Sequence, residues 1–398
     1  MDKQDNRQLT LHERWAMDVE AFKNGATWKI SSPQCESCEY FIFGNVKNCA
    51  QYTLPKQKPI FVLSAKKECP KFRHKDTMNI IPETKHEEQF WGGILGFCVG
   101  DALGVPVEFT SREERKKDPV QEMRAYGTYH QHFGTWSDDT SMTLCLIESL
   151  KNGYDLQNIA DTFCKFYYEK HWTPHNEVFD IGNTTVRAIE RMKNGMNPVE
   201  CGGNQESDNG NGSLMRVLPL AFYLRQTEAP QKIKMIEEVS SLTHAHQRSK
   251  FACVIYVEFA MNLLSHDKQD ACQNTIKFVS DCCSVNYNDK PGIFNRILNN
   301  ELITADENNI RSSGYVVDSL EAGIWAFMTT DNYGDAIFKA INLGGDTDTI
   351  AALTGGLAGL YYGVNAIPNN WIQCLARKNE IYNLIQRTGN GRSYMYDI

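Results

Sequence analysis

The stretch that decides the fold is WGGILGFCVGDALGVPV, which occupies residues 91–107. Glycine recurs in it at every fourth position, at Gly92, Gly96, Gly100 and Gly104. In a helix these positions share one face, and each glycine costs about 1 kcal/mol relative to alanine. A neighbouring backbone that packs unusually close would offset this cost, and the small-residue segment 351–359 (AALTGGLAG) offers a matching helix. We therefore expect these two helices to form a buried central pair.

The rest of the chain indicates a helical fold from about residue 86 onward. Nearly every segment there carries apolar residues at intervals of three and four, as at Ile233, Ile236 and Val239. Alternating runs of valine and isoleucine, which strands favour, are scarce. We predict an all-α, compact multi-helix domain over 86–398. It follows a small, loop-rich extension over 1–85 that contains four of the thirteen cysteines.

Composition narrows the classes of function. The chain has 398 residues with 41 basic and 49 acidic side chains. Residues 1–88 hold 14 basic and 12 acidic ones, which leaves 27 and 37 for the larger part, so we expect no nucleic-acid backbone binding there. The polar start does not fit a secretory signal, and the apolar stretch 91–107, interrupted by Asp101, falls short of a membrane span. The odd number of cysteines fits reduced thiols, so we expect a cytoplasmic protein without membrane contact.

Two acidic segments precede apolar helical patterns: 134–142 (GTWSDDTSM) and 343–350 (LGGDTDTI). Taken singly, each is explained as a helix N-terminus, where an acidic side chain gains about 0.3–1 kcal/mol. If the two termini converged, four carboxylates would crowd together. Unit charges about 4 Å apart repel by about 4 kcal/mol at an effective dielectric constant of 20. Two divalent cations would neutralise such a cluster, and oxygen ligands favour Mg²⁺ or Mn²⁺.

Two further segments indicate ligand contacts. The glycine-rich loop 210–216 (GNGSLMR) offers backbone N–H groups to an anion, although a turn with a surface arginine explains its spacing equally well. His244 and His246 are two residues apart, and on a helix they would point in different directions. A shared metal is therefore not expected, whereas a structural role or a hydrogen bond to a ligand is.

The order of these motifs resembles that of the ADP-ribosylglycohydrolases, a family that includes the dinitrogenase reductase-activating glycohydrolase. The resemblance covers about residues 88–375 and does not reach the first 85 residues. The matching segments are GDALG at 100–104 with Glu108, WSDDT at 136–140, DIGNT at 180–184, NGSLMR at 211–216, TH at 243–244 and GGDTDT at 344–349.

The resemblance implies an all-helical enzyme with two Mg²⁺ or Mn²⁺ ions. It would hydrolyse the glycosidic bond between ADP-ribose and a protein arginine or serine side chain, or a small-molecule acceptor, and release ADP-ribose. The implied metal ligands are Ser137, Asp138, Asp139, Asp346, Asp348 and Thr349. The implied ADP-ribose contacts are Asn211, Gly212, Ser213, Met215, Arg216, His244, Gly344 and Gly345. Position 137 is commonly threonine in the family, and serine keeps the hydroxyl ligand.

The resemblance also implies a catalytic set of Glu108, Asp180 and Asp139. Cleavage at C1 of the ribose builds oxocarbenium character, so a carboxylate must move a proton while the sugar is held in place. Glu108 and Asp180 are alternatives for this acid/base. We favour Glu108 for an oxygen-linked leaving group and Asp180 for a guanidinium, and either could instead orient another group.

The cysteines of the extension are Cys35, Cys38, Cys49 and Cys69. They fit a four-thiolate structural Zn²⁺ site, which would hold a small segment in shape without a large core and would serve partner recognition. Only one close pair is present, so unligated thiols and an iron–sulfur centre stay open. Cys98, Cys145 and Cys253 fall in apolar helical patterns and are expected in the core.

Two other functions stay open for this sequence. A two-metal phosphoesterase acting on ADP-ribose-type nucleotides would use the same cations but would release AMP and ribose phosphate. A non-catalytic ADP-ribose-binding protein would keep only the pocket, and retention of all four acidic residues of the implied metal site argues against it.

Overall fold

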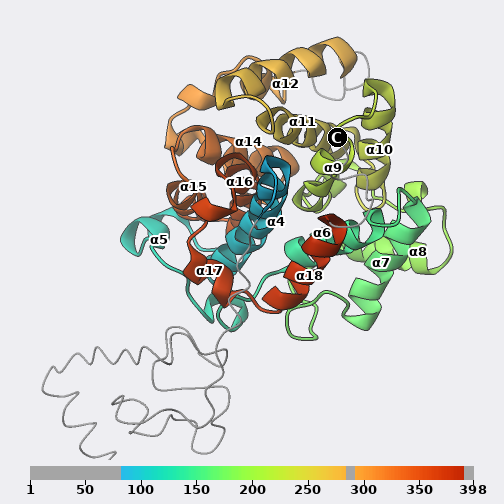
Figure 1. The fold of residues 1–398 in the computed structure, drawn as a ribbon, viewed down its shortest axis with the longest axis horizontal. Coiled ribbons are helices and arrows are strands. Elements are labelled where there is room, and N and C mark those ends of the chain that lie inside the picture. Colours follow the sequence, from blue (N-terminus) through green and yellow to red (C-terminus); the bar gives the residue numbers. More distant parts are fainter. Residues whose placement is uncertain (1–81, 284–291, 390–398) are drawn as a thin grey trace, which may run out of the picture. The chain divides into compact units, whose positions relative to one another are not determined.

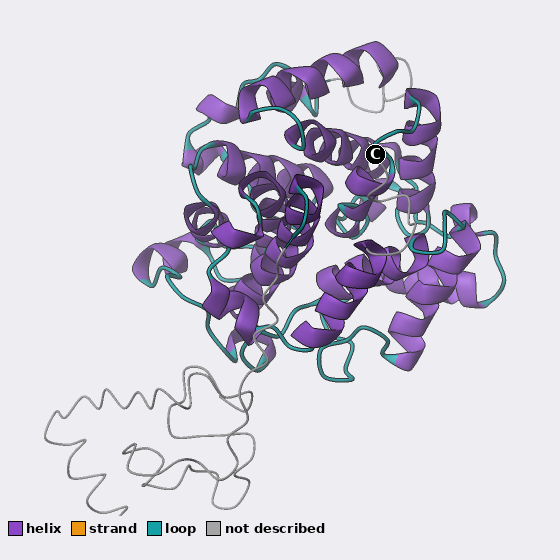
Figure 2. Ribbon diagram, viewed as in Figure 1, coloured by secondary structure: helices purple, strands orange, loops and turns teal. Residues whose placement is uncertain are grey.

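The computed structural model describes residues 82–283 and 292–389, and within these ranges the regular structure is helical (Figures 1 and 2). This part of the chain contains isolated β-bridges but no strand, so the all-α prediction is confirmed for it. The predictions for residues 1–81, the four cysteines included, lie outside the described residues.

The α-helices are α4 (Lys85–Gly104), α5 (Arg112–Lys117), α6 (Asp138–Leu150), α7 (Leu156–Glu169), α8 (Asn183–Lys193), α9 (Pro219–Tyr223), α10 (Ala229–Ser241), α11 (Gln247–Leu263), α12 (Lys268–Cys283), α13 (Asn295–Leu298), α14 (Val316–Met328), α15 (Tyr333–Ile341), α16 (Thr347–Tyr362), α17 (Asn369–Cys374) and α18 (Lys378–Gly389). The described residues also include short 3-10 helices, among them η1 (Val105–Val107), η2 (Gly127–Tyr129) and η5 (Leu214–Arg216).

Helices α4 and α16 form the predicted central pair and run antiparallel (Figure 1). A Cβ atom placed on Gly92 would lie 2.1 Å from the carbonyl oxygen of Gly359, and one on Gly100 would lie 2.1 Å from that of Ala351. Real Cβ contacts are never so short, so glycine is required wherever the two backbones touch. Helices α14 and α15 also pack against α16, and Tyr333 of α15 donates a 2.7 Å hydrogen bond to the Gly96 carbonyl oxygen of α4.

The apolar character of α4 is explained by its burial. The segment Lys85–Val107 is long and apolar enough to cross a membrane, so the sequence-based statement that the stretch is too short was wrong. The helix begins at Lys85, before the apolar run, and together with the adjoining 3-10 turn η1 it makes a segment of 23 residues. However, 94% of the apolar window is buried inside the fold, as in a core helix.

The chain between α10 and α11 differs from the expectation. His244 and His246 were placed on one helix, but α10 ends at Ser241 and α11 begins at Gln247, with His246 as its N-cap. Residue 244 instead pairs with Gly203 in a β-bridge. A side chain that caps a helix takes part in backbone hydrogen bonding, which competes with helix continuation. Cys98, Cys145 and Cys253 are buried free thiols, as predicted.

Candidate metal centre and active site

The C-terminal end of α4 brings the two acidic segments together. The carboxylate of Asp101 accepts hydrogen bonds from the backbone N–H groups of Ser137 and Thr140, at 2.9 and 3.0 Å, and so holds the start of α6. One turn later, the carbonyl oxygen of Gly104 accepts a hydrogen bond of 2.8 Å from Thr347 Oγ1, at the start of α16. Both acidic helix N-termini are therefore fixed to one end of the same helix, and they converge.

The segment that follows α4 adds Glu108 to this point. Directly after Glu108, Phe109 donates its backbone N–H to the carbonyl oxygen of Gly345 at 2.7 Å, and Gly345 donates back to Thr110 at 2.8 Å. Gly345 has a φ of +75°, and a Cβ there would lie 2.0 Å from the carbonyl oxygen of Ser312, so only glycine fits. These contacts fix Glu108 beside the start of α16.

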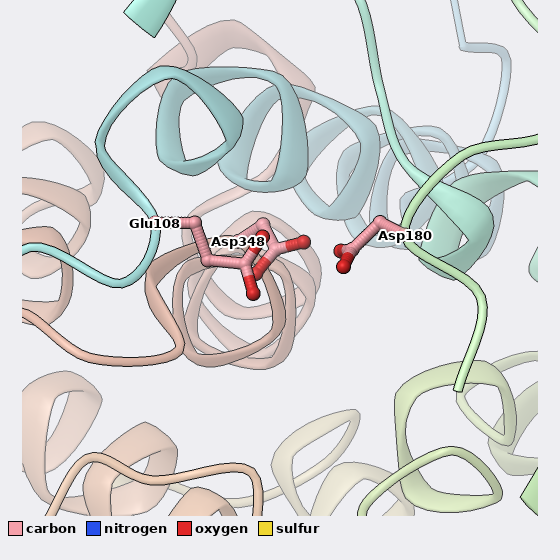
Figure 3. A group of neighbouring side chains, drawn as sticks. All are labelled: Glu108, Asp180 and Asp348. Atoms are coloured by element: carbon pink, nitrogen blue, oxygen red, sulfur yellow. The ribbon is translucent and has the colours of Figure 1, made fainter. Parts of the chain in front are cut away.

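Carboxylates from three separate segments meet at this place. Glu108, Asp180 and Asp348 each offer one ligand atom, and these atoms lie within 4.8 Å of one another. Figure 3 shows that the three side chains point toward a common space from the loop after η1, the loop before α8 and the first turn of α16. Glu108 and Asp348 are buried, whereas Asp180 is half-buried. The cluster therefore has a closed side and a more open side.

The four aspartates of the acidic segments belong to the same cluster. Burial raises the pKa of Asp139 well above its usual range, and the charges of Asp101, Asp138 and Asp346 raise it further. Burial likewise raises the pKa of Asp348, with contributions from Glu108, Asp180, Asp346 and Asp139. Residues 139 and 348 are therefore close enough to influence each other electrostatically, so the condition that the sequence left open, the convergence of the two segments, is met.

Burial and neighbouring charge also govern the remaining acids. Burial raises the pKa of Asp138, as do Asp180 and Asp101. Burial raises the pKa of Glu108 to about 10, with further contributions from Asp180 and Asp346. Asp346 is an intermediate case, because burial raises its pKa while a hydrogen bond from Asn211 Nδ2, at 3.0 Å, lowers it. Among the described residues, no basic side chain is one of the main causes of the pKa shifts of these five acids, so the protein itself supplies the cluster with little positive charge.

Hydrogen bonding does not supply the missing compensation. Several buried carboxylate oxygens have no partner among the described residues: Glu108 Oε2, Asp139 Oδ2, Asp346 Oδ1, Asp348 Oδ1 and Asp348 Oδ2. Buried oxygens of this kind are normally hydrogen-bonded, so each requires an explanation. A divalent cation with oxygen ligands satisfies them and neutralises the charge at once. The residues present thus fit a hard-cation site.

The remaining predicted ligands lie at the helix starts. Ser137 is the N-cap of α6, and its Oγ accepts the backbone N–H of Asp139 at 3.2 Å, which confirms the predicted cap. Thr349 is buried in the first turn of α16 and donates a hydrogen bond that lowers the pKa of Asp346. Both hydroxyls lie next to the carboxylates in sequence, and their assignment as metal ligands stays a prediction.

Sequence reasoning gave no role to Asp101, although its place in the structure is central. Its side chain is fully buried and accepts three hydrogen bonds, one of 2.6 Å from Thr140 Oγ1 besides the two backbone bonds. An isolated aspartate inside an otherwise apolar helix was the available signal, because such a group must find donors in the fold.

The predicted ADP-ribose contacts fall into two groups. Asn211, Gly212 and His244 lie together: a Cβ on Gly212 would be 2.7 Å from Cε1 of His244, and Asn211 reaches Asp346. Gly344 and Gly345 lie beside Thr110 and Ser312, so their glycine identity has a packing reason. Burial lowers the pKa of His244 to about 3, and its Nδ1 shares a 2.8 Å hydrogen bond with Thr243 Oγ1.

Ser213, Met215 and Arg216 are instead buried in the support of the loop. The Arg216 side chain is fully buried, donates to the carbonyl oxygens of Gly212 and Val239, and lies 4.9 Å from the Phe163 ring. These contacts are internal to the protein and support the loop 210–216. The predicted contact of these three residues with ADP-ribose stays a prediction.

The helical fold and the buried, donor-poor carboxylate centre together define an all-α protein with a candidate site for hard divalent cations. The sequence profile of the ADP-ribosylglycohydrolases matches residues 82–395, and the chain therefore belongs to that family. This confirms the resemblance drawn from the motifs and makes the chain an enzyme that hydrolyses glycosidic bonds.

Individual relatives support the assignment. The chain is 33% identical over 318 residues to an ADP-ribosylarginine hydrolase (Tri1) of Serratia proteamaculans, covering 77% of this chain and 81% of the relative. It is 30% identical to the ADP-ribosyl-[dinitrogen reductase] glycohydrolase of Rhodospirillum rubrum, covering 73% and 90%. A solved structure titled as an ADP-ribosylglycohydrolase-related protein complex matches with a TM-score of 0.63 and 29% identity, covering 76% and 98%.

Proposed function

We propose that the protein hydrolyses the N-glycosidic bond between C1 of ADP-ribose and the guanidinium group of an ADP-ribosylated arginine. The observation that carries the proposal is the convergence of buried carboxylates from α4's end, α6 and α16 into one donor-poor centre. Arginine is preferred over serine as the acceptor because the Serratia relative is named an ADP-ribosylarginine hydrolase.

We propose further that two divalent cations, Mg²⁺ or Mn²⁺, occupy this centre. The residues that would hold them are Ser137, Asp138, Asp139, Asp346, Asp348 and Thr349. When bound, such ions supply Lewis acidity that orients the two hydroxyls of the ribose and activates water at neutral pH. The unpartnered oxygens of Asp139, Asp346 and Asp348 support this assignment.

The protein's own side chains then divide the proton transfers. Asp180 lies on the more open side of the cluster, and its Oδ1 accepts a hydrogen bond from the Tyr129 hydroxyl, which fixes its direction. Glu108 lies deeper, with Oε2 buried and unpartnered. We assign Asp180 to the acceptor side, where it would hold the departing guanidinium, and Glu108 to the water that attacks C1. A general base must be ionised and within hydrogen-bond reach of the proton it takes. Glu108 Oε2 has no other partner, and the positive charge of the bound cations would have to bring the pKa of Glu108 down from about 10 for this role.

ADP-ribose would lie between this centre and the loop 210–216. Since its pKa is lowered to about 3, His244 is neutral and acts as a hydrogen-bonding group rather than as a cation. Its Nδ1 is taken up by Thr243, so Nε2, close to Gly210 and Gly212, is the nitrogen that can face a ligand. Arg216 would hold the loop in position from its buried site.

We further propose a cytoplasmic location and a Zn²⁺ site in the N-terminal extension. The described cysteines that carry free thiols support a reducing, cytoplasmic location. A Zn²⁺ site at Cys35, Cys38, Cys49 and Cys69 would make the extension a second folded unit that serves target recognition.

The test is turnover of matched arginine- and serine-linked ADP-ribosyl peptides, in EDTA and with added Mg²⁺ or Mn²⁺. We expect release of free ADP-ribose from the arginine peptide only with cation, and near-complete loss in Asp348→Ala. Asp270→Ala, an exposed aspartate on α12, is the matched control and should keep full activity. Release of AMP would indicate a phosphoesterase, binding of ADP-ribose without turnover would indicate a non-catalytic protein, and full activity in Asp348→Ala would show the site assignment to be wrong.

A further inference from the structure

A row of three aromatic side chains borders the carboxylate cluster. The Phe109 and Tyr129 rings are 6.5 Å apart between centroids, and the Tyr129 and Phe179 rings are 5.2 Å apart. Two of these residues are direct chain neighbours of cluster carboxylates, since Phe109 follows Glu108 and Phe179 precedes Asp180. Tyr129 joins the row to the cluster through its hydrogen bond to Asp180. We call Phe109, Tyr129 and Phe179 the aromatic row.

The row is held in place by contacts that do not depend on the rings. The turn η2 is pressed onto η1, because a Cβ on Gly127 would lie 1.7 Å from the carbonyl oxygen of Pro106. Thr128 Oγ1 donates a 2.7 Å hydrogen bond to the carbonyl oxygen of Glu108. These two contacts hold η2, and with it Tyr129, against the segment that carries Glu108. The row is therefore built by the same segments that build the centre.

Burial decreases from the centre toward the row. Asp348 and Glu108 are almost completely buried, Asp180, Tyr129 and Phe179 are half-buried, and Phe109 is 69% exposed. A single exposed apolar side chain needs no explanation, but a contiguous apolar patch tends to mark a binding site, and the three rings adjoin one another. A substrate reaching the centre from solvent would pass the row first.

Rings and carboxylates together select for one chemical group. A planar cation is attracted to the face of an aromatic ring and to a nearby carboxylate at the same time, and the guanidinium group suits both because it is flat, delocalised and weakly hydrated. A neutral hydroxyl acceptor gains neither attraction. Asp180 supplies the charge and Phe109 the most accessible ring.

We propose that the aromatic row is the acceptor subsite, which stacks on the guanidinium of the arginine while Asp180 binds its edge. The proposal rests on the proposed function and deepens it, since it assigns acceptor selectivity to residues beyond those that hold ADP-ribose or cations. Phe109 is the specificity-determining residue of this subsite.

The experiment compares wild type with Phe109→Leu and Phe109→Tyr, in the presence of Mg²⁺. Leucine keeps the bulk of the side chain but removes the π face, whereas tyrosine keeps the face. Tyr168→Leu is the matched control, because Tyr168 is also an exposed aromatic residue but lies on α7. The readouts are kcat and KM on an arginine-linked ADP-ribosyl peptide, inhibition by the unmodified arginine peptide, and ADP-ribose affinity by calorimetry.

We expect Phe109→Leu to raise KM and the inhibition constant of the unmodified peptide by about fivefold, the equivalent of about 1 kcal/mol of cation–π attraction. ADP-ribose affinity and kcat should stay close to wild type, and Phe109→Tyr should restore KM. A wild-type KM in Phe109→Leu, or an equal loss of ADP-ribose affinity, would overturn the subsite. If wild type itself fails to release ADP-ribose from the arginine peptide, the proposed function is wrong and the subsite falls with it.

Discussion

The substitution Asp348→Asn should make the cation-free protein more stable while removing its response to Mg²⁺. Both carboxylate oxygens of Asp348 are buried without a hydrogen-bond partner, and the ligand atoms of Glu108 and Asp180 lie within 4.8 Å. Asparagine has nearly the same shape but no charge, and its amide offers two N–H donors to the carboxylates around it. The substitution therefore removes repulsion and adds donors at once.

The expected magnitude follows from the geometry. The ligand atom of Asp348 lies within 4.8 Å of those of Glu108 and Asp180, and two unit charges at this distance repel by about 3 kcal/mol at an effective dielectric constant of 20. The cluster already relieves part of this by binding protons, since burial and neighbouring acids raise the pKa of Asp348. We therefore expect a gain of about 1–3 kcal/mol in the free energy of unfolding near neutral pH, or a few degrees in melting temperature. Cation at about 100 times its Kd should raise the free energy of unfolding of wild type by about 2.7 kcal/mol. The variant should show no such increase on addition of cation.

Thermal unfolding of both proteins in EDTA and in a Mg²⁺ series tests the reasoning. The variant should melt above wild type in EDTA. At Mg²⁺ of about 1,000 times its Kd, wild type gains about 4.1 kcal/mol and should melt above the variant, so the order of the two proteins reverses. Asp270→Asn, at an exposed position of α12, should follow wild type throughout. A variant that melts below wild type in EDTA, or that keeps the full Mg²⁺ shift, would refute the idea that Asp348 is an uncompensated cation ligand.

Three further predictions concern packing, pH and the support of the centre. Gly100→Ala should lower the free energy of unfolding, measured in urea, by about 1–3 kcal/mol or more, because the new Cβ would lie 2.1 Å from the Ala351 carbonyl oxygen. This loss should outweigh the better helix propensity of alanine. Gly182→Ala, with open space around it, is the control, and a stabilised Gly100→Ala would contradict the close helix pair. In EDTA, the free energy of unfolding should fall as the pH rises from about 4.5 toward about 10, because the pKa of Glu108 in the folded protein exceeds its ordinary value. If urea titrations show that the free energy of unfolding rises across this pH range, the buried cluster is contradicted. Asp101→Asn should weaken Mg²⁺ affinity, measured by calorimetry, by about 10- to 100-fold, because asparagine has only one oxygen to accept the two backbone N–H groups at the start of α6. An unchanged affinity would exclude this positioning role of Asp101.

The parts of the account that the sequence predicted depend on local rules or on composition. Glycine at every fourth position of one helix is costly, so it required a close partner, and α16 supplied it. Ser137 before two acids is the pattern of a helix N-cap, and the structure has it there. Four carboxylates at two helix starts predicted a shared centre only on the condition that the starts converge.

The parts that the sequence missed depend on distant contacts. Nothing near Tyr129 in the chain indicates that it reaches Asp180, because the contact depends on how η2 packs onto η1. Arg216 follows a glycine-rich loop and was expected at an anion, yet its described contacts are internal because the loop folds over it. The sequence predicts helix around His244 because the composition of this short link does not show that two helix ends meet there.

The central claim is that the acids of α6 and α16 hold divalent cations in common. Diffraction from crystals grown with Mn²⁺, measured at the manganese absorption edge, tests this most directly. We predict two anomalous peaks, about 3.5–4 Å apart, between the side chains of Asp139 and Asp348. A map without a peak between these two residues, with manganese bound only at exposed acids, would contradict the account.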